Sequence, residues 1–499
     1  MDRAAVIPPA ALHRLLRFAW VAGLLAPVVA ASAATYTVTT DAALTRFDVR
    51  ACFEGPPIAL AAGTTRADEL LIEAALVNGP KRTALASRDA RIEPTGAAPG
   101  DCIAYSVRLD ADQNDRNGIR RINGAVIAPS RLWLWRPAES VRLRLEFALP
   151  EGLAVSAPWS SADGSAASFD LNATPASWRD QVAIGALQRF DVPIGDAVLR
   201  VALVPSHSDA EPERYRPWLA EAAGAVAGLY GRFPVAEAQV LLVESARSQG
   251  AVPWAQVLRG GAPAALFVVN PTHPIEDYHD DWTAVHEFAH LLLPHLRDED
   301  LWVSEGFASY YQNVLRARAG MLSAADAWSK LWAGFRRGQR ATDPRQTLTE
   351  ATESRYGRQR MRVYWAGAAL ALQADIELRQ RSAGATGLAD MLGQLERCCL
   401  DPGKLWSGAL LFRRLDALAG TDFLEPLYRE YADSRQFPEV GPLYAALGIG
   451  TKGESVELHG EPGVAALRGA IDGSVLSSGV ARGASVSFDV PGQISTESQ

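Results

Sequence analysis

Cysteine, histidine and methionine are rare in this chain, which has 4, 8 and 4 of them among 499 residues. None of the cysteines has the paired spacing that holds a structural zinc ion, so domains of the zinc-finger type are excluded. Cys52 and Cys102 can form a disulfide if the chain is exported to an oxidising compartment. Cys398 and Cys399 are adjacent, a pattern more typical of a buried helix end than of a disulfide between neighbours.

The chain also lacks an excess of positive charge and long apolar runs. It has 49 basic and 57 acidic residues and a formal net charge of -8, which argues against nucleic acid as a partner. Beyond residue 33 no apolar stretch reaches the length of a membrane-spanning helix. With 48% hydrophobic and 21% charged residues the composition is that of a globular protein, and the length predicts about two to four domains.

Residues 1–33 have the pattern of a secretory signal peptide. Arg14 and Arg17 precede the apolar run 18–30, and the small residues 31–33 form a cleavage site. The run is short for a membrane span, although an uncleaved anchor is the alternative. We expect export to the periplasm or the medium, with no stable membrane span after cleavage.

Two of the rare histidines lie in the segment His286-Glu287-Phe288-Ala289-His290, which has the pattern H-E-x-x-H. On a helix, residues i and i+4 share one face, so both imidazoles can reach one metal ion. Glu287 then lies beside the metal, where a general base can act on metal-bound water. The alternative is a chance match on a structural helix.

A catalytic zinc site needs a third protein ligand and one open position. Glu305 is the candidate, because it begins a second helical pattern that Ser304 can cap. A solvated turn at 297–300, between two antiparallel helices, would bring Glu305 back to the histidines. The sequence therefore predicts one Zn²⁺ ion bound by His286, His290 and Glu305.

The motif H-E-x-x-H followed by W-x-x-E-G-x-x-x-Y-Y at 302–311 resembles the gluzincin metallopeptidases, and residues 301–306 are most similar to their glycyl aminopeptidase family. This resemblance implies a thermolysin-like catalytic domain that hydrolyses peptides or proteins with zinc. It also implies that Tyr364, in a Y-x-x-G segment, faces the scissile carbonyl. A phenol there donates a hydrogen bond to the developing oxyanion. Tyr356 is the second choice for this role.

The resemblance also exposes a difference from aminopeptidases. Gluzincin aminopeptidases hold the substrate's α-amine with a glutamate in a glycine-rich segment ahead of H-E-x-x-H. The segment here, 259–264, has two glycines, which would let a substrate backbone approach, but no carboxylate. We expect internal peptide bonds to be accepted along a predicted edge strand at 265–269. Glu276 and Asp277 are the alternative amine anchors, so endopeptidase and aminopeptidase action both stay open.

Two further polar clusters have ordinary explanations. The segment 110–114 is similar to a calcium loop but lacks the central glycine and the closing glutamate, so it is predicted to be a polar turn. Four arginines precede Tyr364, and they indicate either a solvated loop with salt bridges or recognition of a substrate carboxylate. These arginines are Arg355, Arg358, Arg360 and Arg362.

The predicted fold class is α+β. Segments such as 103–109 and 141–147 alternate apolar and polar residues, which is typical of antiparallel strands. Residues 215–230 have apolar residues at helical spacing. We predict five segments: a signal peptide at 1–33, a β-rich N-terminal domain at 34–205, a thermolysin-like catalytic domain at 206–345, a helical C-terminal domain at 346–450, and a small β element or flexible tail at 451–499.

Two functions are compatible with these features. The first is a secreted zinc metallopeptidase in which Glu287 assists the attack of zinc-bound water on a peptide bond. The second is a binding or structural protein with a gluzincin fold that retains zinc without turnover. The intact Glu287 favours the first function, because a structural zinc ion needs no base. The oligomeric state is left open.

Overall fold

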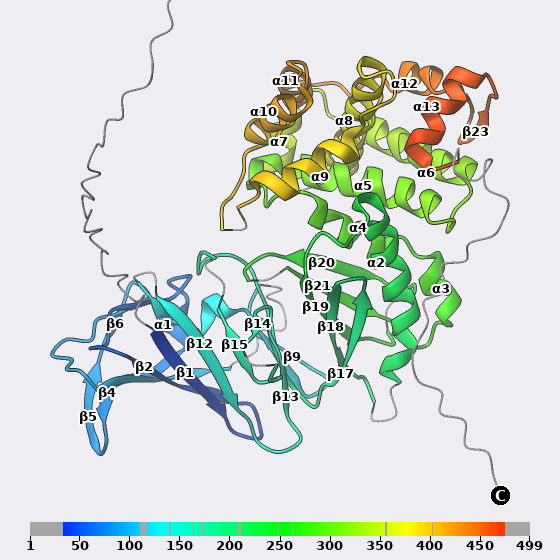
Figure 1. The fold of residues 1–499 in the computed structure, drawn as a ribbon. Helices are drawn as coiled ribbons and strands as arrows, with labels where there is room; N and C mark the ends of the chain where they lie inside the picture. The colour runs from blue at the N-terminus through cyan, green and yellow to red at the C-terminus, as the bar shows by residue number, and fades with distance from the viewer. Residues whose placement is uncertain are drawn as a thin grey trace, which may run out of the picture.

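The structure is a computed structural model, and it describes residues 33–109, 117–138, 141–162, 164–171, 174–207, 211–247, 249–261, 263–354, 357–401 and 403–474. Residues 1–32 of the expected signal peptide, the calcium-like turn at 110–114, Arg355 and Tyr356 lie outside this part. Within it, no helix combines the length and the apolar character needed to cross a membrane. Figure 1 shows most strands in the lower part of the molecule and most helices in the upper part.

Mostly antiparallel strands around one apolar core form most of the first third of the chain, although β1 and β12 pair in parallel. The predicted strands at 103–109 and 141–147 are β8 (Cys102–Arg108) and β12 (Arg142–Ala148), and alternate side chains on both are buried. The largest sheet has the order β14 (Ser160–Ser161), β15 (Ser168–Asp170), β12, β1 (Ala33–Thr40), β2 (Arg46–Phe53), β8, β4 (Leu71–Asn78), β5 (Lys81–Leu85). Two smaller sheets have the orders β13 (Ala154–Ser156), β16 (Val182–Gly185), β10 (Ala125–Ala128), β9 (Arg120–Ile122) and β11 (Arg136–Pro137), β3 (Leu60–Ala61), β7 (Arg91–Ile92), β6 (Ser87–Arg88).

Both cysteine pairs form disulfides. Cys52 on β2 and Cys102 on β8 are directly opposite each other in the sheet, and their bond joins the two strands. Cys398 and Cys399, at the end of α9 (Leu388–Cys399), are bonded to each other. The expectation of a buried helix end was therefore wrong, because Cys398 is exposed where the helix ends.

A five-stranded sheet lies under the site, in the order β17 (Gln188–Ile194), β18 (Ala197–Val204), β19 (Glu237–Glu244), β21 (Ala264–Val269), β20 (Trp254–Leu258). The sequence alone predicts an N-terminal domain that extends to residue 205. In the structure, β17 and β18 pair with each other and β18 pairs with β19, so the five-stranded sheet already begins at Gln188. The reason is that β18 is apolar on both faces. Leu199 and Leu203 belong to the core shared with the helices, whereas Ala202 packs towards the sheet that contains β10.

The edge of this sheet differs from the prediction. Strand β21, predicted at 265–269 as the edge, is hydrogen-bonded to β19 on one side and to β20 on the other. The edge strand on this side is β20, and no strand among the described residues pairs with its outer side. An added peptide strand can therefore pair with β20 and not with β21.

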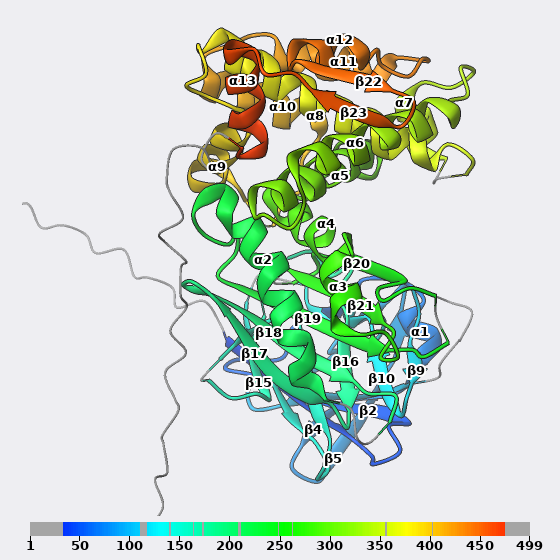
Figure 2. The ribbon, with the colours of Figure 1, turned by 90° about the vertical axis from the view of Figure 1, so that its right-hand side faces the viewer.

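Helices cover one face of the sheet and continue into the upper half (Figure 2). The predicted helix at 215–230 is α2 (Arg216–Tyr230), and its Trp218 packs against Phe267 of β21. Above the sheet, α4 (Thr283–Ala289) contacts α5 (Leu301–Arg318), and α8 (Arg360–Arg381) runs along α5. Further helices are α1 (Ala67–Leu70), α3 (Ile275–Asp280), α6 (Ala324–Arg340), α7 (Leu348–Glu353), α10 (Gly408–Ala419), α11 (Leu424–Asp433) and α12 (Gly441–Ala446).

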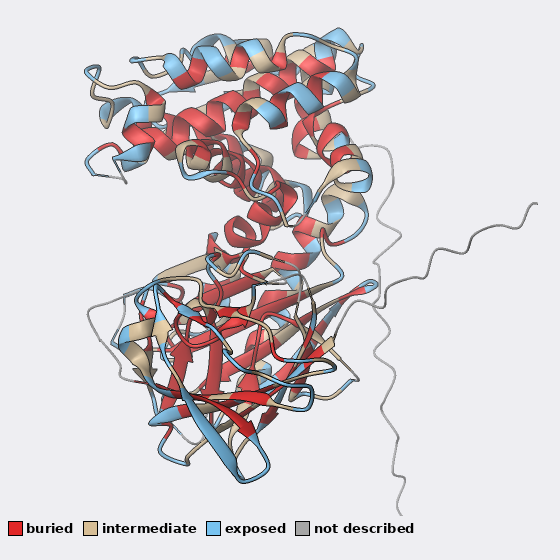
Figure 3. Ribbon diagram, turned by 90° about the vertical axis from the view of Figure 1, so that its left-hand side faces the viewer, coloured by how far each residue is buried: buried red, intermediate tan, exposed pale blue. Residues whose placement is uncertain are grey.

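The described end of the chain contains both expected and unexpected structure. A small β element was expected after residue 450, and β22 (Ile449–Lys452) pairs with β23 (Ser455–Leu458). Helix α13 (Pro462–Asp472) was not predicted, because the glycines of this segment disguise its helical pattern. Trp328 of α6 donates a hydrogen bond of 2.8 Å to Asp472, which fixes α13 to the helical half. Buried residues fill the interior of both halves (Figure 3).

Candidate metal centre

Helix α4 carries His286 and Glu287, and His290 begins the 3-10 turn that follows it. The apolar residues of α4 anchor one of its faces to the sheet. Phe288 packs edge-to-face on Phe267 of β21, and all seven residues of the helix are buried. Asp281, just ahead of the helix, accepts the Thr283 N–H at 2.7 Å. This carboxylate satisfies a backbone donor that the first helical turn leaves unpaired.

The two histidines and Glu305 meet at one point. The Nε2 atoms of His286 and His290 lie 3.4 and 3.7 Å from the same carboxylate oxygen of Glu305. One ligand atom from each of the three residues lies within 4.8 Å of the others. Two imidazoles and one carboxylate form a donor set that zinc takes in catalytic sites. The residues present therefore fit zinc.

The connection that returns Glu305 to the histidines differs from the predicted solvated turn. Asp300 is buried, accepts the Gly408 N–H at 2.8 Å and is hydrogen-bonded by the Tyr428 hydroxyl. Helix α5 begins at Leu301, so Ser304 lies inside the helix instead of capping it. Asp300 thus ties the connection to the C-terminal helices, which the local sequence does not reveal.

Two residues of α5 hold the imidazoles in the orientation that metal binding needs. The Nδ1 atom of His286 lies 2.8 Å from Gln312 Oε1, and that of His290 lies 2.9 Å from Ser304 Oγ. With a proton on each Nδ1, both Nε2 lone pairs are directed at the ligand point. Sequence reasoning missed both partners. Helical spacing indicates Gln312, because it follows Glu305 by two turns on the same face.

Burial determines the protonation of the ligands. It lowers the pKa of His290 to about 3, so this imidazole is neutral near pH 7. Burial also opposes charge on Glu305, but the hydrogen bond to His286, the charge on His286 and the hydrogen bond from Tyr364 leave the pKa of Glu305 below its usual range. For His286, the effect of burial is outweighed by Glu305 and Glu287, and its pKa is raised. An anionic Glu305 next to histidine Nε2 atoms that point at the same place is suited to bind a cation.

Glu287 lies between the ligand cluster and the edge strand. Burial raises its pKa to about 7, with a further contribution from Glu305, while His286 and the backbone N–H of Val257 on β20 act in the opposite direction. The hydrogen bond from Val257 joins the motif to the strand at which a peptide can add. A carboxylate with a pKa near neutrality can both accept and release a proton.

Tyr364 of α8 is close to the ligands. Its ring is stacked on that of His286 with a centroid distance of 6.1 Å, and its hydroxyl hydrogen-bonds Glu305. Arg360 lies over the Tyr364 ring at 5.3 Å. Arg362 is instead buried and donates hydrogen bonds to backbone carbonyls, including that of Ser434. The predicted arginine cluster is therefore not one site, and Arg362 has a structural role.

The segment after the edge strand also differs from the prediction. Gly260 and Gly261 pack against the N-terminal part of the chain: a Cβ on Gly260 would meet the Arg179 carbonyl carbon at 2.6 Å, and one on Gly261 would meet the Trp159 ring at 2.9 Å. The glycines serve this contact and do not make room for a substrate. Arg259 is directed to the other side, where its guanidinium donates a hydrogen bond to the His290 carbonyl oxygen.

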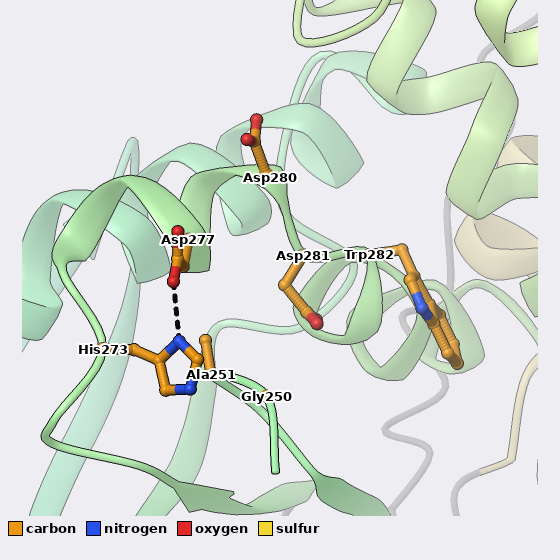
Figure 4. A pocket seen from close by; sticks show the side chains of 7 residues that line it. All are labelled: Gly250, Ala251, His273, Asp277, Asp280, Asp281 and Trp282. Carbon is orange, nitrogen blue, oxygen red and sulfur yellow. Dashed lines mark hydrogen bonds and ion pairs between the residues drawn. The ribbon is translucent and has the colours of Figure 1, made fainter.

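A shallow hollow lies at the other end of α4 (Figure 4), lined by Gly250, Ala251, His273, Asp277, Asp280, Asp281 and Trp282. The Trp282 side chain is 44% exposed, and its ring meets that of His286 edge-on at 5.3 Å. Asp277, an alternative amine anchor, lies in α3 and pairs with His273 at 2.6 Å. Asp277 is thus engaged by the residue just ahead of its own helix.

Comparison with known proteins agrees with this geometry. The M61 glycyl aminopeptidase family matches residues 293–370, which include Glu305 and Tyr364 but begin after His290. No curated protein matches the chain. Its fold is similar to an aminopeptidase N family protein from Idiomarina loihiensis, with 16% identity, a TM-score of 0.65, and coverage of 83% of this chain and 78% of that one. It is also similar to an M1 zinc metallopeptidase from Deinococcus radiodurans, with 17% identity, a TM-score of 0.50, and coverage of 82% and 94%.

In its fold, its ligand cluster and the segment 293–370, the chain is similar to the gluzincin metallopeptidases. Over residues 293–370 it is similar to the M61 glycyl aminopeptidases in particular.

Proposed function

We propose that the chain is a secreted, zinc-dependent peptidase with a thermolysin-like catalytic domain, in which Glu287 is the general base. The observation that supports this most strongly is the position of Glu287, buried beside His286 and Glu305 and hydrogen-bonded by the edge strand at Val257. Zinc bound by His286, His290 and Glu305 would lower the pKa of a water molecule and polarise the peptide carbonyl.

Glu287 carries out the proton transfers of the reaction, and Tyr364 stabilises the oxyanion. Glu287 takes the proton of the attacking water and then delivers it to the leaving amine. The Tyr364 hydroxyl, adjacent to Glu305, donates a hydrogen bond to the oxyanion that forms during attack. Val257 orients the base through its backbone N–H.

The peptide is bound along β20. Since the Val257 N–H points outward to Glu287, the backbone groups of Ala255, two residues earlier, point to the same side. These outward groups can form main-chain hydrogen bonds with an extended substrate. No carboxylate occurs in the segment 259–264 to hold a free α-amine. We therefore propose cleavage of internal peptide bonds.

Export follows from residues 1–33, which have the signal-peptide pattern, and the Cys52–Cys102 disulfide is compatible with an oxidising compartment. We propose the periplasm or the medium as the location.

The test is digestion of an unstructured polypeptide by purified protein with one bound zinc ion, with the products identified by mass spectrometry. Cleavage at internal bonds supports the proposal. Zinc binding without any product would instead support an inactive binding protein, which the missing amine-anchoring carboxylate favours.

A further inference from the structure

Helix α4 and the edge strand β20 run side by side, and the contacts between them follow the same order along both elements. Ala251, just before β20, and Trp282, just before α4, line the same hollow. Val257 on β20 contacts Glu287 in α4, and Arg259, just after β20, contacts His290 at the end of α4. A peptide that pairs with β20 beside the metal ligands therefore passes Arg259.

Arg259 has donor capacity to spare. Its guanidinium donates one hydrogen bond, to the His290 carbonyl oxygen, and its backbone N–H donates to the Arg179 carbonyl oxygen at 3.2 Å. No carboxylate of the described residues pairs with the guanidinium. Among the described residues, no second acceptor is bonded to its guanidinium. The side chain is half-buried, which places a fixed positive charge in a partly desolvated position at the end of the edge strand.

A charge in this position discriminates between substrates. A half-buried guanidinium binds a carboxylate with charge-assisted, often bidentate hydrogen bonds, and it repels an ammonium group. Arg259 lies in the very segment, 259–264, where an amine anchor would need a negative charge. Arg259 thus places a positive charge where an amine anchor would need a negative one.

We propose that Arg259 is a specificity-determining residue that binds a carboxylate of the peptide substrate, so that the site selects acidic peptides and disfavours a free amino terminus. This inference rests on the proposed peptidase function. The carboxylate belongs either to an acidic side chain near the cleaved bond or to the carboxyl terminus of the peptide.

The experiment compares peptides that are identical except for Glu, Gln or Lys at one position next to the cleaved bond, each with a free or an amidated carboxyl terminus. We expect wild-type kcat/KM to be about tenfold or more higher for Glu than for Gln, and lower still for Lys. If the chain terminus is the ligand, the difference appears between free and amidated peptides instead. In R259Q the ratio of kcat/KM for the Glu peptide to that for the Gln peptide should fall to near one. In R259K this ratio should stay partly raised.

A purely structural role of Arg259 predicts a different result. R259Q would then lower kcat/KM for all peptides by the same factor and leave their ratio unchanged, which would overturn the proposal. R297Q is the matched control, because exposed Arg297 already pairs with Glu299 at 3.7 Å. It should keep the wild-type preference.

Binding of the same peptides to zinc-loaded protein, measured by calorimetry, separates the two proposals. Tighter binding of Glu peptides that is lost in R259Q, without any cleavage, would contradict the peptidase function alone. Cleavage without a preference for a carboxylate in either measurement would contradict the role of Arg259 alone.

Discussion

Gly306 on α5 and Gly367 on α8 are in backbone contact: a Cβ on either glycine would overlap the other helix, at the Gly367 backbone or at the Trp302 carbonyl oxygen. Glu305 directly precedes Gly306, and Tyr364 lies one turn before Gly367. The close crossing of the two helices therefore sets the distance between the ligand carboxylate and the tyrosine hydroxyl. The glycines of the E-G and Y-x-x-G segments are explained by this contact.

The first prediction concerns this crossing. Gly306→Ala or Gly367→Ala forces the helices apart and should cost about 1–3 kcal/mol of unfolding free energy, together with a loss of turnover. Denaturant unfolding and peptide hydrolysis measure the two effects. Gly228→Ala on α2 is the control, because its Cβ meets nothing within 4 Å. It should stabilise the protein by about 0.5–1 kcal/mol. Equal stability of all three variants would contradict the packing argument.

The second prediction concerns the metal ligands. His286→Ala or His290→Ala removes one of the three donors, and the purified protein should lose its zinc in elemental analysis. His279→Ala should keep full zinc, since His279 lies on α3 and pairs with Glu221. Full zinc occupancy in His286→Ala would refute the ligand assignment.

The third prediction concerns Gln312. Gln312→Leu removes the partner of His286 Nδ1 and should weaken zinc binding by about 10–100-fold. Competition with a chelator measures this affinity. Ser304→Ala should act in the same direction through His290. An unchanged affinity in both variants would show that the imidazoles are oriented by other contacts.

The fourth prediction concerns the substrate's amino terminus and the edge strand. Acetylation of a peptide should not abolish its cleavage, because no carboxylate in 259–264 holds the free amine. Ala255→Pro removes an outward N–H of β20 without breaking the ladder to β21, so it should lower kcat/KM while zinc stays bound. Stepwise cleavage of free-amine peptides only would contradict this, and Glu276 would then be the first acidic residue to replace.

Local patterns predict the elements but not how they meet. Alternation predicts β8 and β12, and helical spacing predicts α2, because burial on one face leaves a periodic trace in the sequence. The order of strands leaves no such trace. Both β20 and β21 are short apolar segments, and only their pairing shows that β20 is the edge.

In the candidate site, too, local spacing predicts some residues but not the contacts between distant parts of the chain. The spacing of the H-E-x-x-H motif is enough to predict that His286 and His290 share one helical face, with Glu287 beside them. The burial of Asp300, the contact of Arg259 with the His290 carbonyl, and the hydrogen bond from Val257 to Glu287 join residues far apart in the chain. Such contacts depend on tertiary packing, which spacing along one helix or strand does not encode.

The most direct test of the account is the hydrolysis rate of Glu287→Gln, measured with its zinc content. Glutamine keeps the shape of the side chain but cannot accept the proton of the attacking water. The account predicts full zinc occupancy and a fall in turnover by a factor on the order of a hundred or more. Wild-type turnover in zinc-loaded Glu287→Gln would contradict the central claim that Glu287 is the base.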